Sequence, residues 1–144
     1  MTAITIEQCY IPDLSTSAPC PLFLVSVCAG FPSPADDYLE GKLDLNEHLI
    51  QHEAATFFVK VRGDSMIGAG IHCGDLLIVD RVLEPTDNRV VVAVVQGELT
   101  LKRLCKQDGK LCLRPDNGNY PPIEITEATD FEVWGVVTHV IHPV

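Results

Sequence analysis

Residues 89–104 read RVVVAVVQGELTLKRL, and this stretch decides how the chain folds. Its continuous apolar run is typical of a strand that is covered on both faces. Gln96-Gly97 then predicts a tight hairpin turn into a second strand. Because side chains alternate along a strand, Lys102 and Arg103 point to opposite faces. At most one of these two basic residues can therefore belong to a given site.

Further strands are predicted around this hairpin. Apolar or alternating patterns indicate strands over residues 56–61, 75–80 and 131–141. Asp108-Gly109 predicts another hairpin, and Asn117-Gly118 predicts a turn. Many strands joined by Gly and Pro turns, with only short helices, indicate a mainly β fold of curled antiparallel sheets.

The first twenty residues predict little regular structure. Strand character over residues 4–6 is weak, and Pro12, Pro19 and Pro21 then break the chain. We therefore expect a loosely held, extended N-terminal arm. Residues 22–29 are apolar and extended in tendency, so they suit either an edge strand on the core or a strand added to a protease cleft.

Two short helices are expected after this arm. Ser33-Pro34 with Asp36 matches a helix start, since it offers a capping serine, a proline at the first helical position and an acid in the first turn. Gly41 is expected to end this helix. Asp44 is expected to cap a second short helix over residues 44–50.

The segment Gly63-Asp-Ser-Met66 follows a predicted strand and supplies a candidate nucleophile, Ser65. A serine hydroxyl attacks well only when a neighbouring base takes its proton. Lysine can be that base when burial among apolar side chains lowers its pKa, and Lys102 has such a setting. Taken alone, each residue also fits a plainer interpretation, a turn serine and a strand lysine that reaches solvent.

Composition limits the function. A chain of 144 residues that is 47% hydrophobic suffices for one domain with a buried core. Its formal net charge of -10 argues against direct nucleic-acid binding, which needs clusters of Lys and Arg. The apolar run over residues 21–30 has no basic residue before it and is too short to cross a bilayer, so we expect no signal peptide and no membrane segment. A cytoplasmic protein is expected.

The six cysteines and five histidines show no metal-binding pattern. No CxxC pair occurs, and the histidines lack zinc-ligand spacing. His48 and His52 are four residues apart, which favours a pair on a helix surface over a metal site. We therefore expect neither a metal nor a cofactor. In a reducing compartment the cysteines are expected mostly to fill the core.

Several stretches together resemble UmuD- and MucA-type proteins, within the LexA-like family of self-cleaving serine peptidases (S24). These stretches occur in the family's order at Ala29–Ala35, Phe58–Met66, Gly74–Asp80, Glu98–Leu104 and Trp134–Val137. The resemblance implies a LexA/signal-peptidase-like fold, a Ser65/Lys102 dyad and self-cleavage between Ala29 and Gly30. It also implies a removable arm over residues 1–29 and a catalytic and dimerisation domain over residues 30–144.

Placing that bond beside the dyad gives a mechanism. Neutral Lys102 takes the Ser65 proton, Oγ attacks the Ala29 carbonyl, and the backbone N–H of Ser65 stabilises the oxyanion. Lys102 then gives its proton to the departing Gly30 nitrogen. Because the substrate is tethered, cleavage must be held back until something favours the cleavable conformer.

The resemblance implies what that trigger is. It is the RecA filament on single-stranded DNA, formed in the SOS response to DNA damage. The shortened form is then implied to be a homodimeric accessory subunit of an error-prone, UmuC-type Y-family translesion polymerase. A second hypothesis is a non-cleaving binding subunit of a polymerase, in which the dyad is idle.

Overall fold

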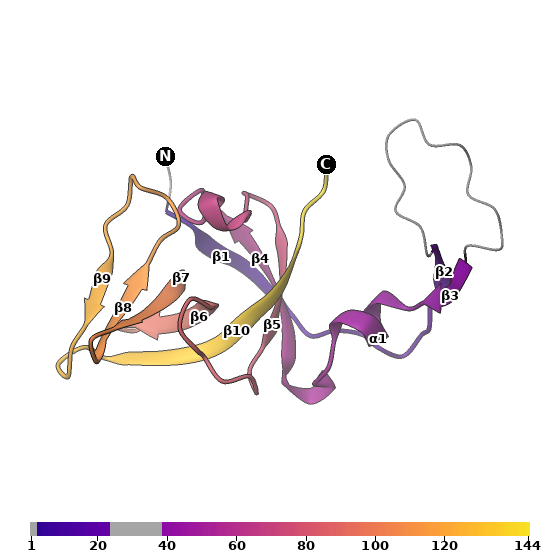
Figure 1. Ribbon diagram of the computed structural model, residues 1–144, viewed down its shortest axis with the longest axis horizontal. Coiled ribbons are helices and arrows are strands. Elements are labelled where there is room, and N and C mark those ends of the chain that lie inside the picture. Colours follow the sequence, from indigo (N-terminus) through magenta and orange to yellow (C-terminus); the bar gives the residue numbers. More distant parts are fainter. Residues whose placement is uncertain (1–2, 24–38) are drawn as a thin grey trace. The chain divides into compact units, whose positions relative to one another are not determined.

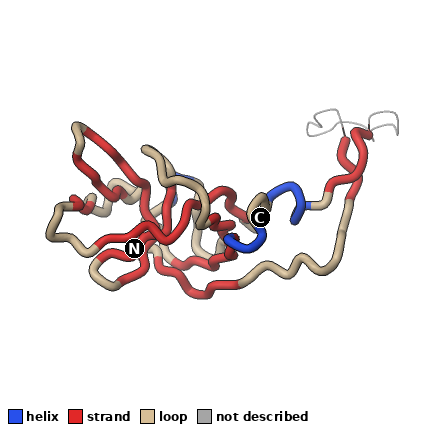
Figure 2. The backbone as a smooth tube through the Cα atoms, turned by 90° about the horizontal axis from the view of Figure 1, so that it is seen from below, coloured by secondary structure: helices blue, strands red, loops and turns tan. Residues whose placement is uncertain are grey.

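A computed structural model describes residues 3–23 and 39–144 of the protein (Figure 1). They fall into two compact units, one combining Met1–Pro12 with His52–Val144 and the other formed by Asp13–Gln51. Strands dominate the described residues (Figure 2), which confirms the expected mainly β fold. Within the described ranges the helices are short, and none has the length and apolar character needed to cross a membrane.

The larger unit is built on an eight-stranded antiparallel sheet with the order β1-β4-β5-β10-β6-β7-β8-β9. Two 3₁₀ turns, η2 (Glu53–Ala55) and η3 (Ile67–Ala69), lie in its connections. The strands are β1 (Thr5–Tyr10), β4 (Thr56–Arg62), β5 (Leu76–Asp80), β6 (Val90–Val95), β7 (Glu98–Gln107), β8 (Lys110–Arg114), β9 (Ile123–Ile125) and β10 (Phe131–Ile141). The predicted strands over residues 56–61, 75–80 and 131–141 are confirmed.

Two tight hairpins set the register of the β6–β8 region. The two central residues of each turn have positive φ. The angles are 50° at Gln96 and 80° at Gly97 in the first turn, and 50° at Asp108 and 74° at Gly109 in the second. Such turns match the right-handed twist of antiparallel strands. The first turn pairs Leu101 with Val92 across the hairpin. Both predicted hairpins are therefore confirmed.

The core forms on both faces of β6, as its continuous apolar run predicts. Val92 belongs to a cluster with Val59, Leu77 and other buried residues, whereas its neighbour Val91 belongs to a second cluster with Leu104. Both valines are fully buried. The curled sheet thus buries residues on each side of this central strand.

Strand β1 corrects the expectation of a loose arm. It pairs antiparallel with β4, from Thr5 opposite Arg62 to Tyr10 opposite Phe58 (Figure 1). Ile4, just before the strand, is 3% exposed. Because β1 is an edge strand whose residues are mostly exposed, its docking depends on backbone pairing and on Ile4 and Ile6, which pack against the core. An apolar pattern was therefore too weak to predict it.

The smaller unit contains a two-stranded sheet of β2 (Cys20–Phe23) and β3 (Leu39–Leu43), followed by helix α1 (Leu45–Leu49). The cap predicted at Asp44 is confirmed, since its Oδ1 accepts a hydrogen bond of 3.0 Å from Asn46 N. The expected end of a helix at Gly41 is wrong. Gly41 lies in β3 opposite Leu22, with φ of 140° that favours glycine. The predicted start of that helix lies outside the described residues.

The cysteines of the described ranges are free thiols. Cys9, Cys20 and Cys73 are exposed, while Cys105 and Cys112 are half-buried. The prediction that cysteines mostly fill the core is therefore wrong for these residues. They lie on edge strands, in a turn and on the β7–β8 hairpin, where side chains reach the surface.

Candidate active site

Ser65 lies in a loop that is fixed at both of its ends. Ser65 is 1% exposed and lies three residues after the end of β4. Val61 O accepts a hydrogen bond of 2.8 Å from Gly74 N, which closes the base of the loop. Met66 O accepts bonds of 3.0 Å from Ala69 N and 3.3 Å from Ile71 N. The predicted nucleophile thus stands on a backbone with little freedom.

The connection between β8 and β9 packs on the same loop. Asn117 Nδ2 donates to Asp64 O at 3.0 Å, and Tyr120 Oη donates to Asp64 Oδ1 at 2.7 Å. Gly68 N donates to Asp116 O at 2.7 Å. Burial, with the bond to Asp64, raises the pKa of Tyr120 to about 12, so its hydroxyl remains a donor at neutral pH.

Lys102 lies on β7 and is 8% exposed. Its Nζ donates to Thr100 Oγ1 at 2.8 Å and to Leu101 O at 3.4 Å. Among the ion pairs of the described residues, none involves Lys102. Burial lowers the pKa of Lys102 because it disfavours the ammonium, and no carboxylate offsets this effect. The amine has the property that a general base requires.

Arg103 turns away from Lys102, as the strand alternation predicts. Its Nε donates to Asp116 Oδ2 at 2.6 Å, and its Nη1 donates to Asn88 O at 2.5 Å. Asp116 in turn accepts the bond from Gly68 in the serine loop. One chain of contacts therefore joins the strand of Lys102 to the loop of Ser65.

We expect Arg103→Gln to loosen this connection. Hydrogen bonds to charged groups contribute about 1.5–3 kcal/mol, so the free energy of unfolding should fall by roughly that amount. Urea unfolding measures the change. Lys106→Gln, at an exposed position of the same strand, serves as the control. Equal stability of both variants and the wild type would show that the Arg103–Asp116 pair holds nothing in place.

The N-terminal segment reaches the candidate nucleophile, which sequence reasoning did not predict. Ile4 N donates to Ser65 Oγ at 2.8 Å, and this bond is buried. A Cβ at Gly63 would lie 2.4 Å from Ala3 O, so the two backbones touch. Gly63 was the one signal in the sequence, since it permits such an approach. Within the described residues, no hydrogen bond joins Ser65 to Lys102.

Gly63→Ala should therefore displace residues 3–10 from the serine loop. Gly63 has φ of 108°, and an alanine there would also overlap Ala3 O. Faster hydrogen exchange of the β1 amides is the expected result. Gly97→Ala is the matched control, because its φ is 80° and nothing lies within 4 Å of the added Cβ. If both variants leave exchange in β1 unchanged, the contact between the two backbones is unimportant.

The structure does not test the predicted cleavage site or the predicted oxyanion donor. Ala29 and Gly30, the expected cleavage site, lie outside the described residues. The Ser65 backbone N–H stays a prediction as an oxyanion donor.

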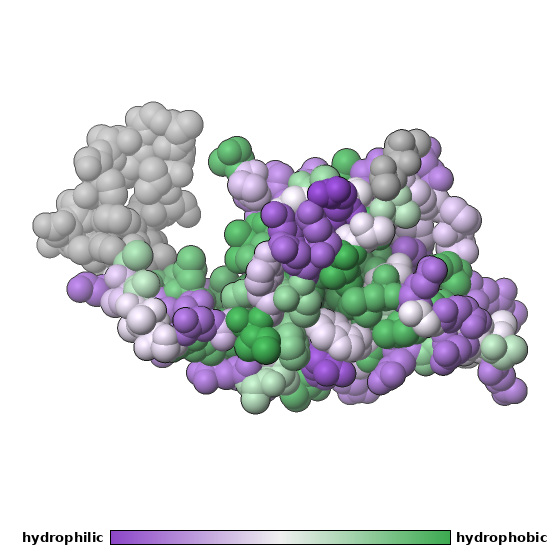
Figure 3. All heavy atoms as spheres, turned by 180° about the vertical axis from the view of Figure 1, so that it is seen from behind, coloured by the Kyte–Doolittle hydropathy of each residue, from purple (hydrophilic) through white to green (hydrophobic). Residues whose placement is uncertain are grey.

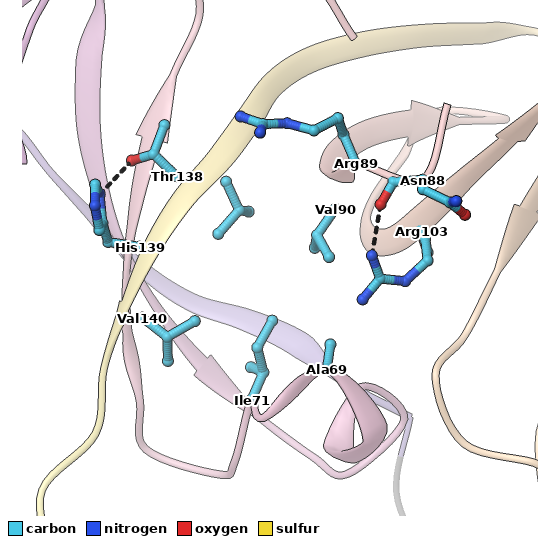
Figure 4. Close-up of a pocket in the computed structure, with 10 residues that line it drawn as sticks. Ala69, Ile71, Asn88, Arg89, Val90, Arg103, Thr138, His139 and Val140 are labelled. Carbon is cyan, nitrogen blue, oxygen red and sulfur yellow. Dashed lines mark hydrogen bonds between the residues drawn. The ribbon is translucent and has the colours of Figure 1, made fainter. Parts of the chain in front are cut away.

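A pocket of about 280 Å³ lies beside η3, with Ala69 in its lining (Figure 4). Neither Ser65 nor Lys102 lines it. Its lining includes Ile71, Val90 and Val140, with Arg103 turned toward Asn88 at one side. The pocket borders the serine loop through Ala69 and Ile71, but it is not the candidate active site.

Comparison with known proteins identifies the family of this chain. Residues 21–138 match the family described as Peptidase S24-like. Protein SamA of Salmonella typhimurium is 46% identical over 122 residues, which cover 85% of this chain and 84% of SamA. Protein MucA of Escherichia coli is 42% identical over 127 residues, covering 86% of each chain. The LexA repressor of Clostridium perfringens is 38% identical over 103 residues, covering 72% of this chain and 51% of the repressor.

The family match shows that the curled antiparallel β domain is of the peptidase class. The chain belongs to the Peptidase S24-like family. Its similarity to MucA and SamA extends over most of the chain, which confirms the resemblance to UmuD- and MucA-type proteins.

Proposed function

We propose that the protein is a serine endopeptidase that cuts its own Ala29-Gly30 bond with a Ser65/Lys102 dyad. Lys102, in its neutral form, takes the proton from Ser65 as Oγ attacks the Ala29 carbonyl. The Ser65 backbone N–H stabilises the oxyanion. Lys102 returns the proton to the Gly30 nitrogen, and water releases the new carboxyl end at Ala29.

The burial of Lys102 is the observation that carries this proposal. A lysine inside a protein is normally paired with a carboxylate, because an unpaired buried ammonium is unfavourable. Lys102 instead contacts a hydroxyl and a carbonyl oxygen, and burial lowers its pKa. Such an environment gives the fold no evident stability, but it raises the share of neutral amine, the form that abstracts a proton.

The bond between Ile4 and Ser65 favours a protein that rests in an uncleaved state. The hydroxyl that must attack Ala29 already accepts a proton from Ile4 N. The Ala3–Ile4 backbone also lies against Gly63, beside the nucleophile. We propose that this segment shifts when cleavage is triggered, which agrees with a tethered substrate that must be held back.

The proposed trigger is a RecA filament on single-stranded DNA, in the SOS response. Membership of a family that includes LexA and MucA supports this role. The proposed product is residues 30–144, a homodimer in the cytoplasm that serves an error-prone, UmuC-type Y-family polymerase in translesion synthesis. The net charge of -10 agrees with recognition of DNA through partner proteins.

Exposed apolar residues agree with the proposed homodimer. Leu99 is 43% exposed and Ile141 is 44% exposed, near the ends of their strands. Figure 3 shows hydrophobic residues distributed between hydrophilic ones on one face of the molecule. Some of this apolar surface is available for contact with a second copy.

Mass spectrometry of the full chain tests the proposal. The protein is incubated with RecA, ATP and single-stranded DNA, and separately at mildly alkaline pH without RecA. We expect a fragment that begins at Gly30 in both, with RecA accelerating its appearance at neutral pH. Cleavage at another bond would overturn the assignment of Ala29 and Gly30, and cleavage that ignores RecA would overturn the trigger.

The second candidate is a non-cleaving binding subunit of a polymerase with an idle dyad. The Ile4–Ser65 bond is the observation that favours it, because the nucleophile is occupied. A chain that stays intact in both incubations, and still binds the polymerase, would select this alternative.

A further inference from the structure

Two histidines distant in sequence meet a buried carboxylate where the serine loop returns to the sheet. Asp75 is fully buried and directly precedes β5. Its Oδ1 lies 2.5 Å from His142 Nδ1, in the C-terminal segment after β10. Its Oδ2 lies 3.8 Å from His72 Nδ1 and accepts a bond of 2.7 Å from His72 N. The two imidazole rings lie side by side, with centroids 4.7 Å apart.

One buried nitrogen of this cluster, His72 Nδ1, has no hydrogen-bond partner among the described residues. Buried polar atoms in native proteins nearly always have a partner. At 3.8 Å, Asp75 is too far from His72 Nδ1 for a hydrogen bond. The nitrogen therefore faces a buried carboxylate across a gap that a small cation suits.

We propose that His72, Asp75 and His142 bind a divalent transition-metal ion of the zinc class. The three ligand atoms all lie within 4.8 Å of one another. Zinc bonds of about 2.0–2.2 Å in a tetrahedron place neighbouring ligand atoms roughly 3.3–3.5 Å apart. The 3.8 Å separation of His72 from Asp75 is close to that value. The 2.5 Å contact of His142 with Asp75 lengthens when the ion lies between the two side chains.

The ligand chemistry selects the metal. Two imidazoles and one carboxylate suit zinc and its neighbours, whereas magnesium and calcium require mainly oxygen ligands. With three protein ligands, water takes the fourth position, so binding is exchangeable. Both histidine side chains are 44% exposed, which leaves the metal a path from solvent. The bound ion ties the C-terminal segment to the base of the loop that carries Ser65.

Titration of the metal-free protein with zinc chloride tests the proposal. We expect one ion per chain and a higher melting temperature, because a ligand that binds only the native state stabilises it. Magnesium chloride should give neither result. His72→Gln and His142→Gln should each weaken zinc binding at least about tenfold, since loss of even an outer-shell partner weakens metal affinity about 10–100-fold. His139→Gln, an exposed histidine on β10, should bind zinc as the wild type does.

Cobalt(II) separates this site from binding by thiols. The exposed cysteines, including Cys73 beside the cluster, are competing ligands. Nitrogen and oxygen ligation gives visible d–d bands alone, whereas thiolate ligation adds a charge-transfer band in the near ultraviolet. The site would be supported if the cobalt protein shows d–d bands without a charge-transfer band, and if these bands vanish in His142→Gln. Thiolate bands, equal zinc affinity in all three histidine variants, or a melting temperature unaffected by zinc would overturn it and leave the cluster as a hydrogen-bonded ion pair.

Discussion

Ser65→Ala is expected to abolish the fragment that begins at Gly30. Removing a serine nucleophile can reduce the rate by a factor on the order of 10⁶, because no other group at that position can form the acyl-enzyme. The measurement is mass spectrometry of the variant after incubation at alkaline pH and with RecA on single-stranded DNA. Over days, no fragment should appear in either condition.

This variant needs a check on folding. Ser65 Oγ accepts the buried bond from Ile4 N, so its loss leaves an unsatisfied donor that can cost about 1–3 kcal/mol. Urea unfolding must show that the variant remains folded during the assay. Thr126→Ala removes an exposed hydroxyl from the same unit and should cleave as the wild type does. Fragment from folded Ser65→Ala at the wild-type rate would remove this serine from the mechanism.

Lys102→Met is expected to slow self-cleavage by about 10²–10⁴-fold, the usual contribution of a general base. In the wild type the rate should rise with pH, since attack requires the neutral amine. It should increase about tenfold per pH unit well below the pKa of Lys102 and level off above it. The lowered pKa places that plateau below the ordinary lysine value of 10.5. Residual cleavage in Lys102→Met should lose this dependence.

The same substitution should stabilise the fold near neutral pH. Because the folded pKa of Lys102 is lowered, the unfolded chain binds more protons between that pKa and 10.5, and stability rises with pH through this window. Below this pH window the buried ammonium lowers the free energy of unfolding. Methionine, which has a similar length and no charge, removes that cost. Urea unfolding at neutral pH and at pH 10 should show a stability advantage of Lys102→Met that shrinks as pH rises. An advantage that grows with pH would contradict a depressed pKa.

The mainly β fold could be predicted because its signals are local. The apolar run of β6 and the Gln96-Gly97 and Asp108-Gly109 turns each determine their structure within a few residues. The alternation of β7 correctly separated Lys102 from Arg103, since a strand has a strict period of two. The cap at Asp44 was equally local, because its side chain bonds an amide two residues away.

Features that depend on distant residues could not be predicted. Strand β1 docks through backbone hydrogen bonds, which leave little trace in the pattern of side chains. The bond from Ile4 to Ser65 joins residues 61 positions apart. His72 and His142 meet only because β10 returns beside β5, so no local spacing could predict that they meet. The prediction that Gly41 ends a helix was wrong because glycine adopts an extended backbone as readily as a helix end.

Titration of the Lys102 side chain by nuclear magnetic resonance tests the central claim most directly. The Cε and Nζ signals of Lys102, assigned by their loss in Lys102→Met, are followed with pH in the folded protein. We expect a pKa clearly below the ordinary lysine value of 10.5. A Lys102 that is still fully cationic at pH 10 would contradict its role as the base for Ser65.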